Sequence, residues 1–224
     1  MMNMTGKIIV GADEAGRGLI IGPMIIGACA VDESVMKEFK LLGIKDSKKY
    51  SSRTKLKMHA EMIKEKALAW SIKVLTAKDL NNYNKNGLTM DEAEAYAFFR
   101  ALENINEKVG KIDTFQVDNF QAVKLLRKLL KQNSQLKDTK LVVSIRAETK
   151  YIAVSAGSIL ARDKALSELL KIKQHYGDFG SGSTSDKRTI NWLTNYFQKY
   201  GSWPADIVRT YWKTIEEIEE RVTR

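Results

Sequence analysis

The chain has 224 residues, of which 44% are hydrophobic and 29% are charged, and its formal net charge is +10. This mixture predicts a folded domain with a sizeable core and excludes a disordered chain. No apolar run reaches the roughly 18 residues that span a bilayer, and residues 1–7 are too short and polar for a signal peptide. We therefore expect a soluble, cytoplasmic monomer with no membrane partner. The positive charge favours nucleic acid as a partner, although a basic surface can also simply keep a protein soluble.

Hydrophobic periodicity and capping residues predict five strands interleaved with helices, followed by helices alone. The expected strands cover residues 7–11, 24–31, 70–77, 112–117 and 141–145. The expected helices cover residues 51–68, 90–106, 120–130, 155–176, 186–200 and 204–221. This order predicts an α/β layered domain with a C-terminal helical appendage. The glycine-rich loop at 177–185 predicts the boundary, which divides the chain into residues 1–180 and 181–224.

Cysteine and histidine are scarce in this chain. Cys29 is the only cysteine and lies in an apolar stretch, so we expect it to be buried rather than reactive. A structural zinc site needs clustered cysteine and histidine side chains, and His59 and His175 stand alone. Any metal ligands in this chain must therefore be oxygens.

Carboxylates follow three of the expected strands. Asp13 and Glu14 follow the first strand. Asp118 follows the fourth strand, and Glu148 follows the fifth. Ligands of open α/β sheets bind beyond the carboxyl ends of strands, and oxygen donors suit Mg²⁺ or Mn²⁺. Two such ions about 4 Å apart can clamp the attacking and leaving oxygens of a phosphodiester. The alternative for the Asp13–Glu14 pair is an ordinary surface turn.

Gly16, Arg17 and Gly18 form a glycine turn directly after the acidic pair. Glycines let the backbone approach a ligand closely, so that exposed N–H groups can bind its oxygens, and arginine can bind a phosphate with two donors. Ile21 stands where a GxGxxG motif needs its third glycine, and the chain has no Walker A sequence. Nucleotide binding is therefore not predicted.

Six further segments stand out along the chain: GADEAGRGLIIGP (11–23), DSKK (46–49), QVDNF (116–120), YIAVSAGSILA (151–161), YGDFGSGSTSD (176–186) and VRTYWKT (208–214). Together they resemble ribonuclease HII, particularly its archaeal members. They occur in the family's order with similar spacings and cover nearly the whole chain. The resemblance implies a ribonuclease H-like fold, with a central mixed five-stranded sheet flanked by helices and a C-terminal helical region that binds substrate.

The resemblance also implies an activity and a ligand set. The expected reaction is endonucleolytic hydrolysis of the RNA strand of RNA–DNA hybrids with two metal ions, which leaves 5′-phosphate and 3′-hydroxyl ends. Asp13, Glu14 and Asp118 match the family's metal ligands. The fourth ligand of the family is an aspartate, and Glu148 holds its place here. Asp163 lies in the following helix, at a register where the family has no catalytic carboxylate.

The same resemblance assigns substrate contacts. Gly16, Arg17 and Gly18 are expected to sense the 2′-hydroxyl near the RNA-to-DNA junction, the group that distinguishes RNA from DNA. Ser47 and Lys48 are expected to hold phosphates of the DNA strand.

The segments at 176–186 and 208–214 add further expectations. Ser183 replaces a family tyrosine that packs against a sugar, which predicts a reduced preference for single ribonucleotides embedded in DNA; Tyr176 or Phe179 is a candidate substitute. Arg209 is either structural or in contact with nucleic acid, and Trp212 is expected to pack. Residues 214–224 contain no clear sliding-clamp motif.

Two alternatives stay open. One is a catalytically weak hybrid-binding protein of the same fold, because some motif positions are substituted. The other is a ribonuclease HIII-like nuclease, against which stand Arg17 between its glycines and the lack of an extra N-terminal domain before the first motif.

Overall fold

A computed structural model describes residues 6–44, 50 and 52–224 of the chain. The strands are β1 (Ile9–Ala15), β2 (Met24–Val31), β3 (Ala69–Leu75), β4 (Thr114–Asp118) and β5 (Lys140–Ser144). The helices are α1 (Glu33–Leu41), α2 (Arg53–Lys66), α3 (Ala77–Lys85), α4 (Met90–Val109), α5 (Val123–Gln132), α6 (Ala147–Lys150), α7 (Ile152–Tyr176), α8 (Lys187–Tyr200) and α9 (Lys213–Thr223). None of the described helices combines the length and the hydropathy that a bilayer-spanning segment requires.

The chain forms two compact units. The first contains the described residues of Met1–Ala15, Ile25–Lys73 and Asp91–Asp163. The second contains Gly16–Met24, Val74–Met90 and Lys164–Arg224. The functional division into residues 1–180 and 181–224 stays a prediction.

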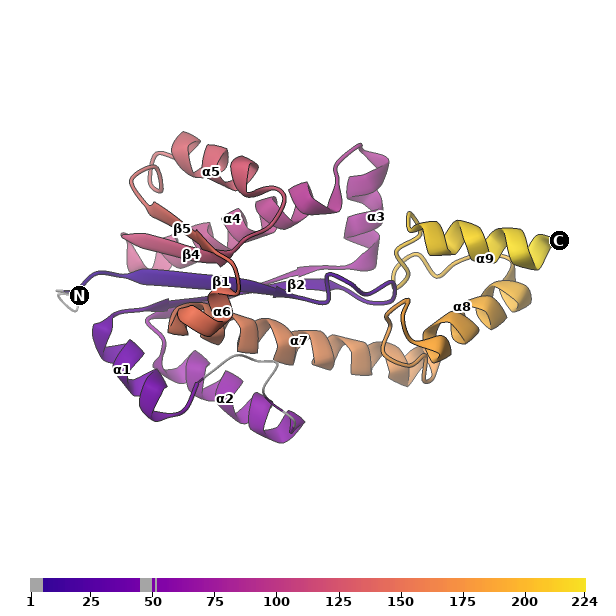
Figure 1. Ribbon diagram of the computed structural model, residues 1–224, viewed down its shortest axis with the longest axis horizontal. Coiled ribbons are helices and arrows are strands. Elements are labelled where there is room, and N and C mark those ends of the chain that lie inside the picture. Colours follow the sequence, from indigo (N-terminus) through magenta and orange to yellow (C-terminus); the bar gives the residue numbers. More distant parts are fainter. Residues whose placement is uncertain (1–5, 45–49, 51) are drawn as a thin grey trace. The chain divides into compact units, whose positions relative to one another are not determined.

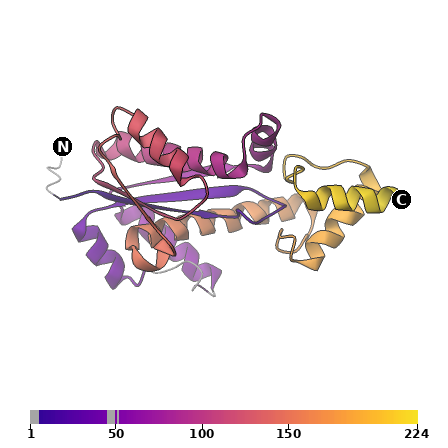
Figure 2. The same cartoon turned by 45° about the horizontal axis from the view of Figure 1, so that its top comes forward.

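The first unit is built on a five-stranded sheet with the order β3-β2-β1-β4-β5. β1 pairs with β2 antiparallel and with β4 parallel, and β4 pairs with β5 parallel. Helices α4 and α5 cover one face of the sheet, and α1, α2, α6 and the beginning of α7 cover the other (Figures 1 and 2). The predicted mixed five-stranded sheet with flanking helices is therefore confirmed.

Glycines bring α7 directly onto the sheet. A Cβ at Gly11 would lie 2.2 Å from the backbone of Ala153 and Val154, and a Cβ at Gly27 would lie 2.2 Å from the carbonyl oxygen of Gly157. No side chain fits into these gaps, so the helix axis lies close to β1 and β2. Cys29 is fully buried in β2 as predicted, and burial raises the pKa of its thiol.

The second unit has its own apolar core. Its fully or nearly fully buried residues are Ile20, Ile21, Phe179, Leu193, Ile207, Val208, Ile215 and Ile218. Backbone hydrogen bonds join segments that are far apart in the sequence: the Ile20 and Ile21 N–H groups donate to the Gly182 carbonyl at 2.8 and 3.1 Å. The segment after β1 therefore belongs to the same core as the C-terminal helices.

Two predicted elements need correction. Asp13 and Glu14 lie inside β1 rather than beyond its end, because pairing with β2 continues to Ala15. The helix predicted over 204–221 begins only at Lys213. The residues before it form turns and extended backbone, since Val208 bridges to Ile21. The side chains of Ser52 and Asp186 cap α2 and α8, which fall within predicted helices, while α1 and α3 have no counterpart among the predicted helices.

Candidate active site

Neighbouring parallel strands carry Asp13 and Asp118 at equivalent positions. The register of β1 and β4 pairs Ala12 with Val117, and the two aspartates come next in each strand. Residues at equivalent positions of adjacent strands point to the same face, and the strands lie about 4.8 Å apart. The two carboxylates are therefore neighbours on the face that α7 covers.

Asp13 is buried, with 7% of its surface exposed. Burial, and then the charge of Glu14, raise the pKa of Asp13 well above its usual value, while a hydrogen bond from Ser158 on α7 lowers it. The Glu14 carboxyl lies close enough to Asp13 to act on its pKa. Consecutive side chains of a regular strand point to opposite faces, so this contact shows that the two carboxyl groups have been brought together. A divalent cation would relieve their repulsion.

Asp118 ends β4 and is held by two backbone donors. Its Oδ1 atom accepts hydrogen bonds from Asn119 N at 2.7 Å and from Arg146 N at 3.1 Å. Arg146 has φ 55°, the only positive φ outside glycine among the described residues, and it is the N-terminal cap of α6. This left-handed turn ties the helix that carries Glu148 to the end of β4.

Glu148 is 5% exposed, and its carbonyl oxygen accepts a hydrogen bond of 2.5 Å from Ser155 Oγ on α7. It lies beside a cavity of about 310 Å³ in the first unit. Gln116 and Lys40 also line this cavity, and Gln116 precedes Asp118 by two residues on the same strand face. Glu148 thus opens into a polar recess at the Asp118 end of the sheet.

The donor atoms suit a hard cation, but the described residues do not gather them closely. No three side chains of Asp, Glu, His or Cys in the described part of the chain lie close enough to hold one metal ion. Asp13 and Glu14 form one pair, and the Arg146 turn links Asp118 to the helix of Glu148. Asp163 lies within helix α7, as predicted, and its side chain is half-buried.

The glycine turn belongs to the second unit. Gly16 has φ +77°, and a Cβ there would lie 2.5 Å from the Pro23 carbonyl oxygen, so only glycine fits. The Leu19 N–H closes the turn on the Gly16 carbonyl at 3.3 Å. Gly18 is exposed, and a Cβ added there would meet nothing within 4 Å. The backbone of Gly18 is therefore open to a ligand.

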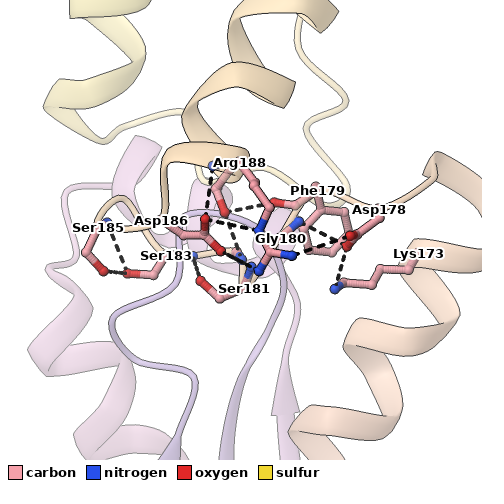
Figure 3. A network of polar contacts seen from close by, with 11 residues as sticks. Lys173, Asp178, Phe179, Gly180, Ser181, Ser183, Ser185, Asp186 and Arg188 are labelled. Carbon is pink, nitrogen blue, oxygen red and sulfur yellow. Dashed lines mark hydrogen bonds and ion pairs between the residues drawn. The ribbon is translucent and has the colours of Figure 1, made fainter.

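Ser183 lies next to this turn, because Leu19 and Ser183 form a β-bridge. Its hydroxyl lies 2.9 Å from that of Ser185, in the loop that leads to Asp186, the N-terminal cap of α8 (Figure 3). Phe179 is fully buried in the core and offers no face to a substrate. Tyr176 is half-buried and donates to Asp206 Oδ2 at 3.4 Å.

Arg209 is fully buried and donates to the carbonyls of Gly16 and Arg17. Of the two roles left open by the sequence, the structure supports the structural one. Trp212 packs against the core of the second unit, as predicted. Ser47 and Lys48 lie outside the described residues.

Sequence reasoning missed two residues of the site. Ser158 falls within the family segment at 151–161, so its position beside Asp13 could have been suspected from that resemblance. The left-handed Arg146 carries no signal in the sequence, because arginine does not favour that conformation.

Comparison with known proteins agrees with this architecture. The family model described as Ribonuclease HII matches residues 10–215. A curated ribonuclease HII from Pyrococcus horikoshii is 36% identical over 95% of this chain and 93% of its own length. The crystal structure of ribonuclease H2 from Pyrococcus horikoshii OT3 is 34% identical, covers 97% of this chain and 99% of that chain, and superimposes with a TM-score of 0.84.

Two further structures have the same architecture. The ribonuclease HII of Archaeoglobus fulgidus, solved in complex with PCNA, is 28% identical over 92% of this chain and 95% of its own, with a TM-score of 0.76. Bst-RNase HIII in complex with Mn²⁺ is 19% identical over 99% of this chain and 72% of its own, with a TM-score of 0.83, and it shares the fold.

The mixed sheet, with Asp13 and Asp118 on adjacent strands, and the match to a solved ribonuclease H2 define an α/β nuclease with the ribonuclease H-like fold. The chain belongs to the ribonuclease HII family. It is a metal-dependent endoribonuclease of the ribonuclease H type, whose substrates are RNA–DNA hybrids.

Proposed function

We propose that the chain hydrolyses the RNA strand of hybrids by two-metal-ion catalysis, with Asp13, Glu14, Asp118 and Glu148 as the ligands of Mg²⁺ or Mn²⁺. The observation that carries the proposal is the strand register, which makes Asp13 and Asp118 neighbours on one face of adjacent strands. The expected products are 5′-phosphate and 3′-hydroxyl ends. When bound, the two ions supply Lewis acidity at the attacking and leaving oxygens.

The protein's own groups prepare this site. Ser158 holds the Asp13 carboxyl, and the backbone N–H of Arg146 holds one oxygen of Asp118, so both carboxylates would be oriented in advance for a bound cation. Glu148 is one methylene longer than the family's aspartate. Mg²⁺ demands near-ideal octahedral geometry at short distances. We therefore expect the second metal position to be altered and Mn²⁺ to be favoured.

Substrate recognition is assigned to the glycine turn and its neighbours. Gly16, Arg17 and Gly18 are proposed to contact the backbone at the RNA-to-DNA junction, and the bridge from Leu19 to Ser183 supports a place for Ser183 beside them. Because Ser183 has no ring, we propose a reduced preference for single embedded ribonucleotides.

The wider setting is proposed from the same resemblance. Ser47 and Lys48 are assigned to DNA-strand phosphates, and residues 181–224 to substrate binding. We expect a cytoplasmic monomer that does not use a clamp motif at 214–224, although the relative from Archaeoglobus fulgidus was solved with PCNA. Co-elution of this chain with a sliding clamp would contradict that expectation.

One experiment tests the reaction. An end-labelled RNA–DNA hybrid is incubated with the protein and Mg²⁺, Mn²⁺ or a chelator, and the products are mapped at both ends. We expect cleavage only with a metal, and ligation-competent 5′-phosphates on the downstream fragments. Binding of the hybrid without cleavage in either metal, or 3′-phosphate ends, would overturn the proposal.

A further inference from the structure

A buried arginine lies beneath the glycine turn. Arg209 has no exposed surface, and its guanidinium donates to three backbone carbonyls: from Nη1 to Arg17 O at 2.6 Å, from Nη2 to Gly16 O at 2.6 Å, and from Nε to Gly22 O at 3.2 Å. The Trp212 ring lies 5.8 Å from the guanidinium carbon. All five residues belong to the second unit.

The two short hydrogen bonds set the direction of two peptide groups. A trans peptide holds its C=O and N–H antiparallel, and the described residues contain no cis peptide. Because the Gly16 and Arg17 carbonyls point at Arg209, the N–H groups that follow, of Arg17 and Gly18, point away from it. The Gly18 N–H has no acceptor within the described part of the chain, and Gly18 is exposed. This leaves a donor aimed outward from a rigidly held turn.

The charge of Arg209 adds to this arrangement. Burial, followed by the repulsion of Arg17, lowers the pKa of Arg209 to about 10, so the guanidinium remains charged at neutral pH. The charged group that acts on it at neutral pH is Arg17, which is itself a cation and not a carboxylate. A buried cation whose partners are carbonyl oxygens polarises those peptides, which strengthens their N–H groups as donors.

We propose that Arg209 is a positioning residue for substrate binding, which orients the glycine turn so that the Gly18 N–H donates to an oxygen of the nucleic-acid backbone. The oxygen belongs to a phosphate or to a 2′-hydroxyl, since both accept a hydrogen bond from a peptide. The inference rests on the proposed function, because it requires that the glycine turn contacts the substrate. It adds a residue that never touches the substrate itself.

A purely structural role predicts something different, and Asn81 provides the matched control. Asn81 on α3 holds the chain segment in which Arg209 itself lies. Its side chain donates to the Ala205 and Val208 carbonyls at 2.9 Å each and accepts from Thr210 N at 2.9 Å. It makes no hydrogen bond to the glycine turn. Asn81→Ala therefore loosens the segment without releasing the Gly16 and Arg17 carbonyls directly.

The test compares Arg209→Lys, Arg209→Gln and Asn81→Ala with the wild type. Lysine keeps the charge and loses the two-pronged geometry, whereas glutamine loses both. Affinity is measured with chelator present, for an RNA–DNA hybrid and for the DNA duplex of the same sequence, at a temperature where thermal melts show every variant folded. We expect both Arg209 variants to bind the hybrid about tenfold more weakly, as for a lost hydrogen bond to a charged acceptor. Asn81→Ala should stay within about twofold of the wild type.

The pattern across the two duplexes identifies the oxygen. A loss confined to the hybrid supports a 2′-hydroxyl, and an equal loss on both duplexes supports a phosphate. Wild-type affinity in Arg209→Lys, or an equal loss in Asn81→Ala, would overturn the positioning role.

A second measurement does not depend on the variants' folding. In the ¹⁵N-labelled wild type, the Gly18 amide resonance should shift on titration with the hybrid. If the wild type cuts the hybrid while this resonance stays unchanged, only the present inference fails. If the wild type neither binds nor cuts the hybrid, the proposed function fails with it.

Discussion

The acidic end of the sheet and the glycine turn hold their polar groups by different means. In the first unit, regular strand pairing places Asp13 beside Asp118, and α7 is fixed by close contact at Gly27. In the second unit, side chains remote in sequence hold irregular backbone: Arg209 donates to carbonyls more than 190 residues away, and Gly182 accepts from Ile20. Strand pairing spreads the positioning of these carboxylates over many backbone hydrogen bonds, so it tolerates the loss of one of them. The glycine turn of the second unit depends on single hydrogen bonds.

The largest expected effect is on the acidic end of the sheet. Asp13→Asn or Asp118→Asn should lower the cleavage rate by more than about a thousandfold, because an amide oxygen cannot replace an anionic metal ligand. Hybrid affinity in chelator and the melting temperature should change little, since binding rests mainly on basic residues and backbone contacts. Single-turnover cleavage assays measure the effect. Near-normal cleavage by either variant would show that the site lies elsewhere.

The next effect is on stability and tests the packing of the same region. Gly27→Ala places a Cβ 2.2 Å from the Gly157 carbonyl oxygen on α7, so helix and sheet must separate. We expect a loss of about 3 kcal/mol or more in the free energy of unfolding, measured by chemical denaturation. Gly6→Ala is the control, because its Cβ would meet only Asp32 Cβ at 3.8 Å. Equal stability of the two variants would contradict the close packing.

This difference between the regions explains what the sequence can predict. The predicted bounds of β2 are correct, because eight consecutive buried positions make an unbroken apolar run. Helix α3 is not predicted from the sequence, although Thr76 and Asp79 form a capping box at its start. The apolar face that follows this box is too short to give a clear helical pattern. The segment before α9 reads as helix because the pairing of Val208 with Ile21 has no local signature. The candidate carboxylates can be proposed from their places near the expected strands, whereas the turn at Arg146 that orients Asp118 cannot be predicted.

The choice of fourth ligand gives a smaller effect. Glu148→Gln should slow cleavage about a hundredfold and increase the dependence on Mn²⁺, because one metal position loses an anionic oxygen. Asp163→Asn is the matched control on α7 and should cut normally. Rates are compared at saturating Mg²⁺ and Mn²⁺. A harmless Glu148→Gln together with an inactive Asp163→Asn would reverse the assignment.

Low pH should destabilise the second unit locally, at the loop shown in Figure 3. Backbone hydrogen bonds, first from Ser181, and the Arg188 side chain lower the pKa of Asp186. A carboxyl with a depressed folded-state pKa contributes stability above its unfolded value, and this contribution is lost as the pH falls through the folded pKa. Below about pH 4, amide exchange at Ser181, corrected for its intrinsic pH dependence, should therefore accelerate. In Asp186→Asn the protection should already be low at neutral pH, and equal protection in both proteins would contradict this.

The smallest expected effect concerns substrate choice at Ser183, where the second region meets its ligand in our proposal. A serine hydroxyl that lies 2.9 Å from Ser185 Oγ cannot supply the flat surface of an aromatic ring. Phe179 is fully buried, so it does not replace that surface. An aromatic contact to a nucleotide is worth roughly 1–3 kcal/mol when it stacks on a base, and a sugar contact falls at the low end, about five- to tenfold in rate. The wild type should therefore cut continuous hybrids well and a lone ribonucleotide in duplex DNA relatively poorly.

Ser183→Tyr should raise the ratio of single-ribonucleotide to hybrid cleavage about fivefold, while Ser185→Tyr, two residues along the same loop, should leave it unchanged. Because both variants add the same ring, an equal response would mean that added apolar surface, and not its place beside the glycine turn, sets the preference. If the wild type already cuts both substrates equally and Ser183→Tyr changes nothing, Ser183 does not determine substrate choice.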